Sequence, residues 1–231
     1  MNQNFINKLA ELGLTPKNEE LYITAFTHRS YLNESREVRH SNERMEFLGD
    51  SVLSFIVSSY LYQRRPEDEE GFLTNLRSYI VKTESLAKIS QNLGLGESLR
   101  LSKGEELSGG KENTQLLANT FEAVLGAIYL DLGLEAATSF VHQTLLPVFS
   151  KEIELGPPKD AKSQLQEMVQ DLTKTSPKYR ILETIGPDHA KRFKVGVFMT
   201  GQEIGVGEGT NKQQAEEEAA KHALEKLASK K

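Results

Sequence analysis

Carboxylates recur at helical spacing in one short stretch of this chain. Glu43, Glu46 and Asp50 would lie within about 60° of one another around a helix. Three carboxylates this close repel one another unless a cation neutralises them. A second stretch repeats the arrangement, because Asn119 and Glu122 are one turn apart within an otherwise apolar run. These two stretches are the candidate site for chemistry, and a bound cation is the chemistry they predict.

The available ligand types favour a hard cation. Carboxylate and amide oxygens suit Mg²⁺ or Mn²⁺ rather than zinc, and the sequence contains no cysteine, which removes thiolate ligands, cysteine nucleophiles and a disulfide scaffold. The alternative is that the carboxylates are solvated or paired with Arg44 and Arg77, as structural ion pairs often are. His28 could add a ligand, but we interpret it as a structural hydrogen-bonding residue.

Helices are expected to position these residues. Apolar side chains recur at steps of three and four over residues 42–63 and 116–130, and the same spacing extends over residues 72–89. Residues 104–110 are polar and contain glycine, which predicts a loop. We therefore expect an all-α domain over residues 1–155.

The period of the apolar residues changes after a proline pair. Two consecutive prolines within residues 156–160 interrupt any helix, so we place a linker there and a second domain at residues 161–229. A helix over 161–172, strands after it and an Ala-rich helix over 211–227 predict a small α-β-β-β-α unit. The sequence favours turns at four glycines, namely Gly201, Gly205, Gly207 and Gly209.

Charge is divided unevenly between these two parts. Residues 1–156 hold 15 Lys and Arg against 22 Asp and Glu, whereas residues 157–231 hold 13 against 11, within a net charge of −5. Surplus carboxylates in the first part could hold a cation. The second part has too little net charge for indiscriminate binding to nucleic acid, so any such contact must come from local clusters.

The stretch Asn42–Ser51 closely resembles the signature of the ribonuclease III family, which cleaves double-stranded RNA. Three further blocks agree in order along the chain: residues 26–31, Glu70–Gly71 and residues 119–123. The resemblance implies that Glu46, Asp50, Asn119 and Glu122 hold Mg²⁺, with Mn²⁺ as a substitute, and that Asp50 and Glu122 are catalytic. It further implies that Glu43 and Glu70 handle substrate, and that Phe47 packs into a partner subunit. Asn119 departs from the family, which more usually has Asp there.

The second domain resembles a double-stranded-RNA-binding domain over its full length. The resemblance places Gln166 and Glu167 of the first helix at one minor groove and His189 in the loop that enters the next. Lys212, at the start of the last helix, would hold phosphates across the major groove. Gln213 and Gln214 stand where family members commonly have basic residues, which predicts weaker phosphate binding.

The resemblance implies a homodimeric endoribonuclease, and the composition predicts a cytoplasmic protein with no membrane segment. The resemblance implies Mg²⁺-dependent hydrolysis of double-stranded RNA to 5′-phosphate and 3′-hydroxyl ends, in the processing of rRNA and mRNA. Two alternatives remain open at this point. One is a double-stranded-RNA-binding protein that has lost catalysis, which Asn119 would explain, and the other is a dimerisation module of a larger RNA assembly.

Overall fold

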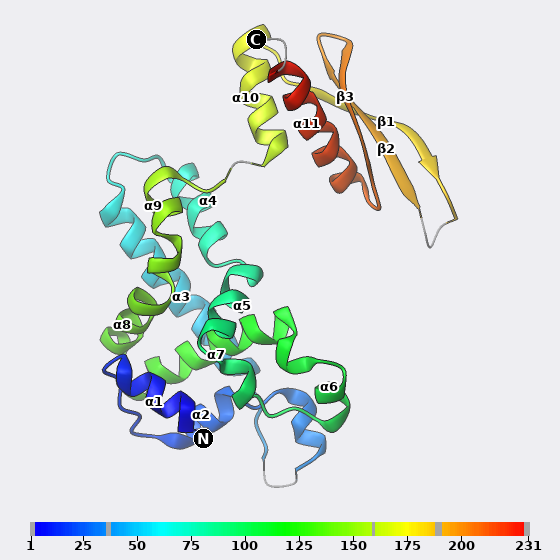
Figure 1. Ribbon diagram of the computed structural model, residues 1–231. Helices are drawn as coiled ribbons and strands as arrows, with labels where there is room; N and C mark the ends of the chain where they lie inside the picture. The colour runs from blue at the N-terminus through cyan, green and yellow to red at the C-terminus, as the bar shows by residue number, and fades with distance from the viewer. Residues whose placement is uncertain (1–2, 36–37, 159, 188–190, 229–231) are drawn as a thin grey trace. The chain divides into compact units, whose positions relative to one another are not determined.

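The computed structural model describes residues 3–35, 38–158, 160–187 and 191–228. By its internal contacts the chain divides into two compact units, Met1–Pro157 and Pro158–Lys231. The first unit is helical and the second combines a three-stranded sheet with two helices (Figure 1). None of the helices in the described ranges is long and apolar enough to span a membrane.

The first unit is a bundle around one hydrophobic core. Its α-helices are α1 (Gln3–Glu11), α2 (Glu19–Ala25), α3 (Glu43–Arg64), α4 (Glu70–Ile80), α5 (Thr83–Asn92), α6 (Lys103–Leu107), α7 (Thr114–Leu132), α8 (Leu134–Thr144) and α9 (Ser150–Leu155). Four short 3₁₀ segments join them: η1 (Arg29–Asn33), η2 (Leu95–Ser98), η3 (Gly110–Glu112) and η4 (Leu146–Phe149). The helical domain expected from the apolar spacing is therefore confirmed.

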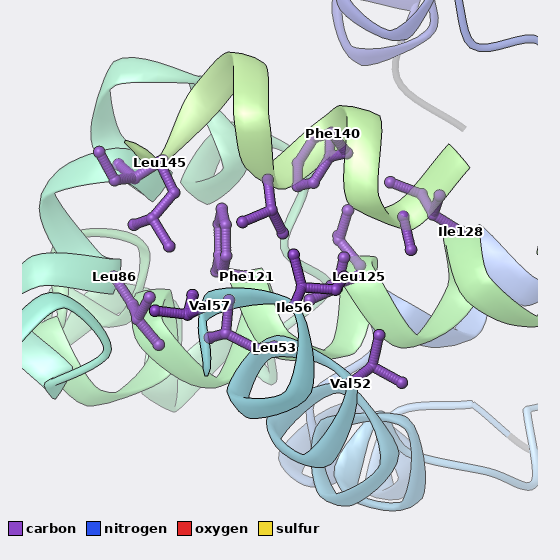
Figure 2. Packing of buried hydrophobic residues seen from close by; sticks show 14 of the residues in the cluster. Val52, Leu53, Ile56, Val57, Leu86, Phe121, Leu125, Ile128, Phe140 and Leu145 are labelled. Atoms are coloured by element: carbon purple, nitrogen blue, oxygen red, sulfur yellow. The ribbon is translucent and has the colours of Figure 1, made fainter. Parts of the chain in front are cut away.

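Helix α7 is the central helix of this unit and contacts α2, α3, α5 and α8. Its N-terminus is capped by Asn113, whose side chain accepts hydrogen bonds from the amides of Gln115 and Leu116. Its C-terminus is set by Gly133, whose φ of 86° favours glycine. Figure 2 shows how α3 packs its apolar side chains against the buried residues Phe121 and Leu125 of α7. The core thus fixes the two helices that carry the candidate site.

The loop expected over residues 104–110 is wrong in part. Residues 103–107 form helix α6, because the Ser102 hydroxyl caps its N-terminus by accepting a hydrogen bond from the Glu105 amide. Glycine does mark a break in the helix at the end of this stretch. Gly109, with a φ of 82°, separates α6 from η3.

The second unit has the order α-β-β-β-α that the sequence predicts. Helix α10 (Ala161–Thr173) precedes strands β1 (Lys178–Ile185), β2 (Arg192–Met199) and β3 (Gln202–Gly209), and α11 (Lys212–Ala228) follows. The strands form an antiparallel sheet in the order β1-β2-β3. Helix α11 packs on β2 and β3, and α10 packs on α11 (Figure 1).

Three of the four glycines expected in turns lie inside β3 instead. A Cβ on Gly205, Gly207 or Gly209 would meet atoms of α11 at 2.9 Å or less, most of them backbone atoms. These glycines alternate along the strand and let the alanine stripe of α11 approach the sheet closely. Gly201, with a φ of 90°, is the glycine that forms a turn.

Candidate active site

Two glycines bring α3 and α7 into close contact. A Cβ on Gly49 would lie 1.8 Å from the carbonyl oxygen of Glu122, and a Cβ on Gly126 would lie 2.5 Å from that of Met45. Neither position has room for a side chain, so the two helix backbones cross in contact. Because Glu46 and Asp50 flank Gly49 in sequence, this crossing places them beside Glu122.

The crossing forms one wall of a pocket of about 510 Å³. The pocket is lined by five of the residues predicted for the site: Glu43, Glu46, Asp50, Asn119 and Glu122. Phe47 and His28 also line it. Glu70 is not among the lining residues; it begins α4, where its carboxylate accepts a hydrogen bond from Thr74.

The carboxylates in this pocket interact electrostatically. Burial, followed by repulsion from Asp50 and Glu46, raises the pKa of Glu122 to about 8. The pKa of Glu46 is raised by burial and by repulsion from Glu43 and Asp50, and a hydrogen bond with Asn119 partly opposes that rise. Without a cation, Glu122 is therefore mostly protonated at neutral pH.

A divalent cation fits this donor set. It would offset the repulsion that now raises the pKa of Glu46 and Glu122, and its preferred ligands are oxygen atoms of the kind gathered here. The side chains as they stand form no finished site: among the described residues, no group of three or more His, Asp or Glu is placed to hold a metal.

Asn119 interacts with Gln115 on its own helix and with Glu46 in the pocket. Its Oδ1 accepts a hydrogen bond of 2.6 Å from the side-chain amide of Gln115, and its side chain also hydrogen bonds to Glu46. Asn119 therefore holds the Glu46 carboxylate in place through its amide group. Gln115 was missed by the sequence analysis, although its spacing of four residues from Asn119 on one helix was a usable signal.

Glu43 does not form the pairs considered as the alternative to a cation site. Its carboxylate accepts hydrogen bonds from Ser41 and, at 3.4 Å, from Arg29, with which it forms an exposed ion pair. Arg77 instead donates to the hydroxyl of Ser58. Arg29 is thus a basic residue beside Glu43 among those that line the pocket. The sequence analysis did not single it out.

Phe47 is 78% exposed on α3, although it is a large apolar residue. It borders a second hollow of about 730 Å³ between α2, α3 and α7, lined by apolar side chains that include Leu21, Met45, Leu48 and Leu130. An exposed aromatic beside an apolar hollow is typical of an interface between proteins.

Comparisons with known proteins identify the family. The family model described as "Ribonuclease-III-like" matches residues 18–149, and that of the "Double-stranded RNA binding motif" matches residues 161–227. "Ribonuclease 3" of Geobacillus kaustophilus is 48% identical over 218 residues, covering 94% of this chain and 88% of that protein. The chain belongs to the ribonuclease III family. The resemblance drawn from Asn42–Ser51 is confirmed.

Other members of the ribonuclease III family agree with this assignment. "Ribonuclease 3" of Streptococcus gordonii is 45% identical, covering 93% of this chain and 92% of its own length. The crystal structure of the nuclease domain of ribonuclease III from Campylobacter jejuni is 36% identical with a TM-score of 0.58, covering 64% of this chain and 96% of that one. The chain is accordingly a double-stranded-RNA-specific endoribonuclease with a C-terminal RNA-binding domain.

In the RNA-binding domain of this ribonuclease III, the predicted contact residues lie on the surface. Gln166 and Glu167 are exposed on α10, and Lys212 is the exposed first residue of α11. Asn211 precedes it and accepts a hydrogen bond from the Gln214 amide. The side-chain oxygen of Gln214 accepts hydrogen bonds from the backbone amide and the hydroxyl of Thr210. His189 lies outside the described residues.

Proposed function

We propose that this ribonuclease III hydrolyses double-stranded RNA with a divalent cation held by Glu46, Asp50, Asn119 and Glu122. The observation that carries the proposal is the half-buried Glu122 carboxylate, which shares one pocket with Asp50 and Glu46 and has its pKa raised to about 8. Mg²⁺ is the proposed ion, and Mn²⁺ would substitute for it because both take oxygen ligands.

Asp50 and Glu122 are the residues proposed as catalytic. When bound, a divalent cation would supply a water of lowered pKa and neutralise negative charge on the phosphate. Glu122 would bind in its deprotonated form, so its proton leaves as the ion enters. Glu46 stays oriented through Asn119. The proposed products carry 5′-phosphate and 3′-hydroxyl ends, and the proposed role is rRNA and mRNA processing in a reducing, cytoplasmic compartment, to which the absence of cysteine is suited.

The proposed active form is a homodimer that joins through Phe47. Its support is the exposure of this side chain beside the apolar hollow bordered by Leu21, Leu48 and Leu130. In ribonuclease III of Campylobacter jejuni, structural flexibility has been described in a region involved in dimer formation of the nuclease domain. Glu70, which lies outside the pocket of its own chain, is proposed to handle substrate in the dimer.

The RNA is proposed to be held by residues 161–229, joined through a linker at 156–160 to a catalytic domain at 1–155. Gln166 and Glu167 would contact one minor groove, His189 the next, and Lys212 the phosphates between them. Duplex selectivity would then come from helix shape and 2′-hydroxyl groups rather than from base edges.

A direct test separates this enzyme from the alternative considered from the sequence, a double-stranded-RNA-binding protein that has lost catalysis. That alternative was motivated by Asn119, whose amide oxygen accepts a hydrogen bond from Gln115. The test is to incubate the full chain with a labelled RNA duplex in Mg²⁺ and, separately, in EDTA. Cleavage only with Mg²⁺ supports the enzyme, whereas a gel shift without cleavage in both supports the binding protein.

A further inference from the structure

His28 lines the same pocket as the proposed cation ligands, but it comes from a third segment of the chain. It directly precedes η1, whereas the acidic residues come from α3 and α7. An anionic phosphate entering an acidic pocket needs hydrogen-bond donors as well as a cation. Arg29, the adjacent donor, is paired with Glu43. His28 is a further donor of this pocket, and it comes from outside the two acidic helices.

The contacts of His28 define which ring nitrogen carries the proton. The Ser30 amide lies 3.3 Å from Nδ1, and an amide can only donate. The Ser30 hydroxyl lies 2.9 Å from the same nitrogen and accepts a hydrogen bond from the Ser102 amide, which leaves its own proton directed at His28. Nδ1 is thus an acceptor and Nε2 carries the proton. Nε2 is the ring nitrogen available to a molecule in the pocket.

The backbone around His28 is fixed from two sides. The His28 amide donates to the carbonyl of Arg100, and the Arg100 amide donates to that of Phe26. On the other side, the amide of the buried Asn42, which precedes α3, donates to the carbonyl of Thr27. These bonds place the imidazole relative to the start of α3, from which Glu43 and Glu46 project. The donor is therefore held in a constant position relative to the carboxylates.

We propose that His28 is a substrate-binding residue that donates a hydrogen bond from Nε2 to a non-bridging oxygen of the scissile phosphodiester. A neutral donor suits this position, because it binds the phosphate without competing with the cation for the carboxylates. This inference rests on the proposed active site, and the experiment below separates the two.

A purely structural role of His28 would need only its acceptor nitrogen, whereas the proposed role needs the donor at Nε2. As a cap of η1 it needs only an acceptor for the Ser30 amide, and asparagine performs this task elsewhere in the chain: Asn18 and Asn113 each accept from the amide two residues on. The His28→Asn substitution preserves that cap and removes the Nε2 donor. The His28→Gln substitution can return a side-chain N–H near the position of Nε2 but is a poor cap.

The experiment compares these two full-length variants with the parent chain in duplex cleavage, Mg²⁺ titration and thermal unfolding. We expect His28→Asn to unfold near the parent temperature yet to have kcat/KM lowered about 10- to 100-fold, the range for a hydrogen bond to a charged group. His28→Gln should be less stable but cleave faster than His28→Asn. The Mg²⁺ concentration for half-maximal cleavage should be unchanged in both, because neither removes a proposed ligand.

Parent-like cleavage by His28→Asn would overturn the proposal, as would losses in both variants that merely follow their stability. Glu122→Gln is included as a reference for the active site itself. If Glu122→Gln is inactive while His28→Asn cleaves normally, the site stands and the role of His28 is wrong. If Glu122→Gln cleaves normally, the proposed active site is wrong, and the His28 inference falls with it.

Discussion

Gly49 of α3 lies directly against the backbone of Glu122 of α7, where a Cβ would come within 1.8 Å of the Glu122 carbonyl oxygen. This contact couples helix packing to the site, because Glu122 cannot approach Asp50 unless residue 49 lacks a side chain. The same residue that permits the helix crossing therefore determines the distance between the proposed ligands.

Gly49→Ala should consequently damage both stability and cleavage. An alanine Cβ would clash with backbone atoms of Glu122, so α3 and α7 must separate. We expect a loss of about 3 kcal/mol in the free energy of unfolding together with severe loss of cleavage. Gly104→Ala is the matched control: it lies in α6 with nothing within 4 Å of its Cβ, and alanine is the better helix former. Equal effects of the two substitutions in urea unfolding would contradict the proposed crossing.

Glu122 should make the metal-free protein less stable as the pH rises. Its pKa is about 8 in the folded chain against an ordinary value of 4.5, so the folded state binds the extra proton between these values. The proton bound to Glu122 stabilises the folded state fully below about pH 4.5, and this stabilisation is lost as the pH rises through 8. In EDTA the melting temperature should fall by several degrees from pH 5.5 to 8.5. Glu122→Gln should reduce that fall, and an identical fall in both proteins would refute the assignment.

Asn119→Asp should lower the Mg²⁺ concentration that gives half-maximal cleavage, by about three- to tenfold. A carboxylate adds a full charge to a partly desolvated site, whereas the amide offers only a dipole. The substitution also replaces the hydrogen bond to Glu46 with repulsion, so the metal-free variant should be less stable. The measurement is a Mg²⁺ titration of both proteins on one duplex, with RNA affinity in EDTA as the control. An unchanged or higher Mg²⁺ requirement would mean that residue 119 is not a ligand.

Phe47→Ala should shift the protein from dimer to monomer in sedimentation equilibrium. The substitution removes an exposed aromatic next to the apolar hollow and leaves the core of α3 unchanged. Tyr62→Ala is the matched control, since Tyr62 is 75% exposed on the same helix but does not line that hollow. A dimer that survives Phe47→Ala at micromolar concentration, or dissociates equally in both variants, would contradict the proposed interface.

The sequence was sufficient to predict which helices carry the site. Residues 42–63 and 116–130 have unbroken apolar periodicity, and the observed α3 and α7 agree with it closely. Local signals were also enough to place Glu46 and Asp50 on one helix face. The crossing at Gly49 and Gly126 could not be predicted, because it depends on which residues meet between segments some 75 positions apart.

Predictions based on short stretches of sequence were wrong where tertiary packing determines the structure. The sequence analysis interpreted three glycines of β3 as turn residues, namely Gly205, Gly207 and Gly209. In the structure they allow α11 to pack closely on β3. Helix α6 was missed because its polar sequence carries no apolar stripe, although the Ser102 cap was a visible start signal. His28 was correctly predicted to form a structural hydrogen bond, whereas its place in the pocket depends on backbone bonds from His28 to Arg100 and from Asn42 to Thr27.

The central claim is that Glu122 and its neighbours form a cation-dependent hydrolytic site, and Glu122→Gln tests it most directly. The substitution keeps the size of the side chain and removes its charge, in full-length protein assayed on one RNA duplex at low Mg²⁺. We expect single-turnover cleavage to fall by about 100-fold or more, while duplex binding in EDTA stays within about twofold of the parent. Near-normal cleavage by this variant at low Mg²⁺ would contradict the account.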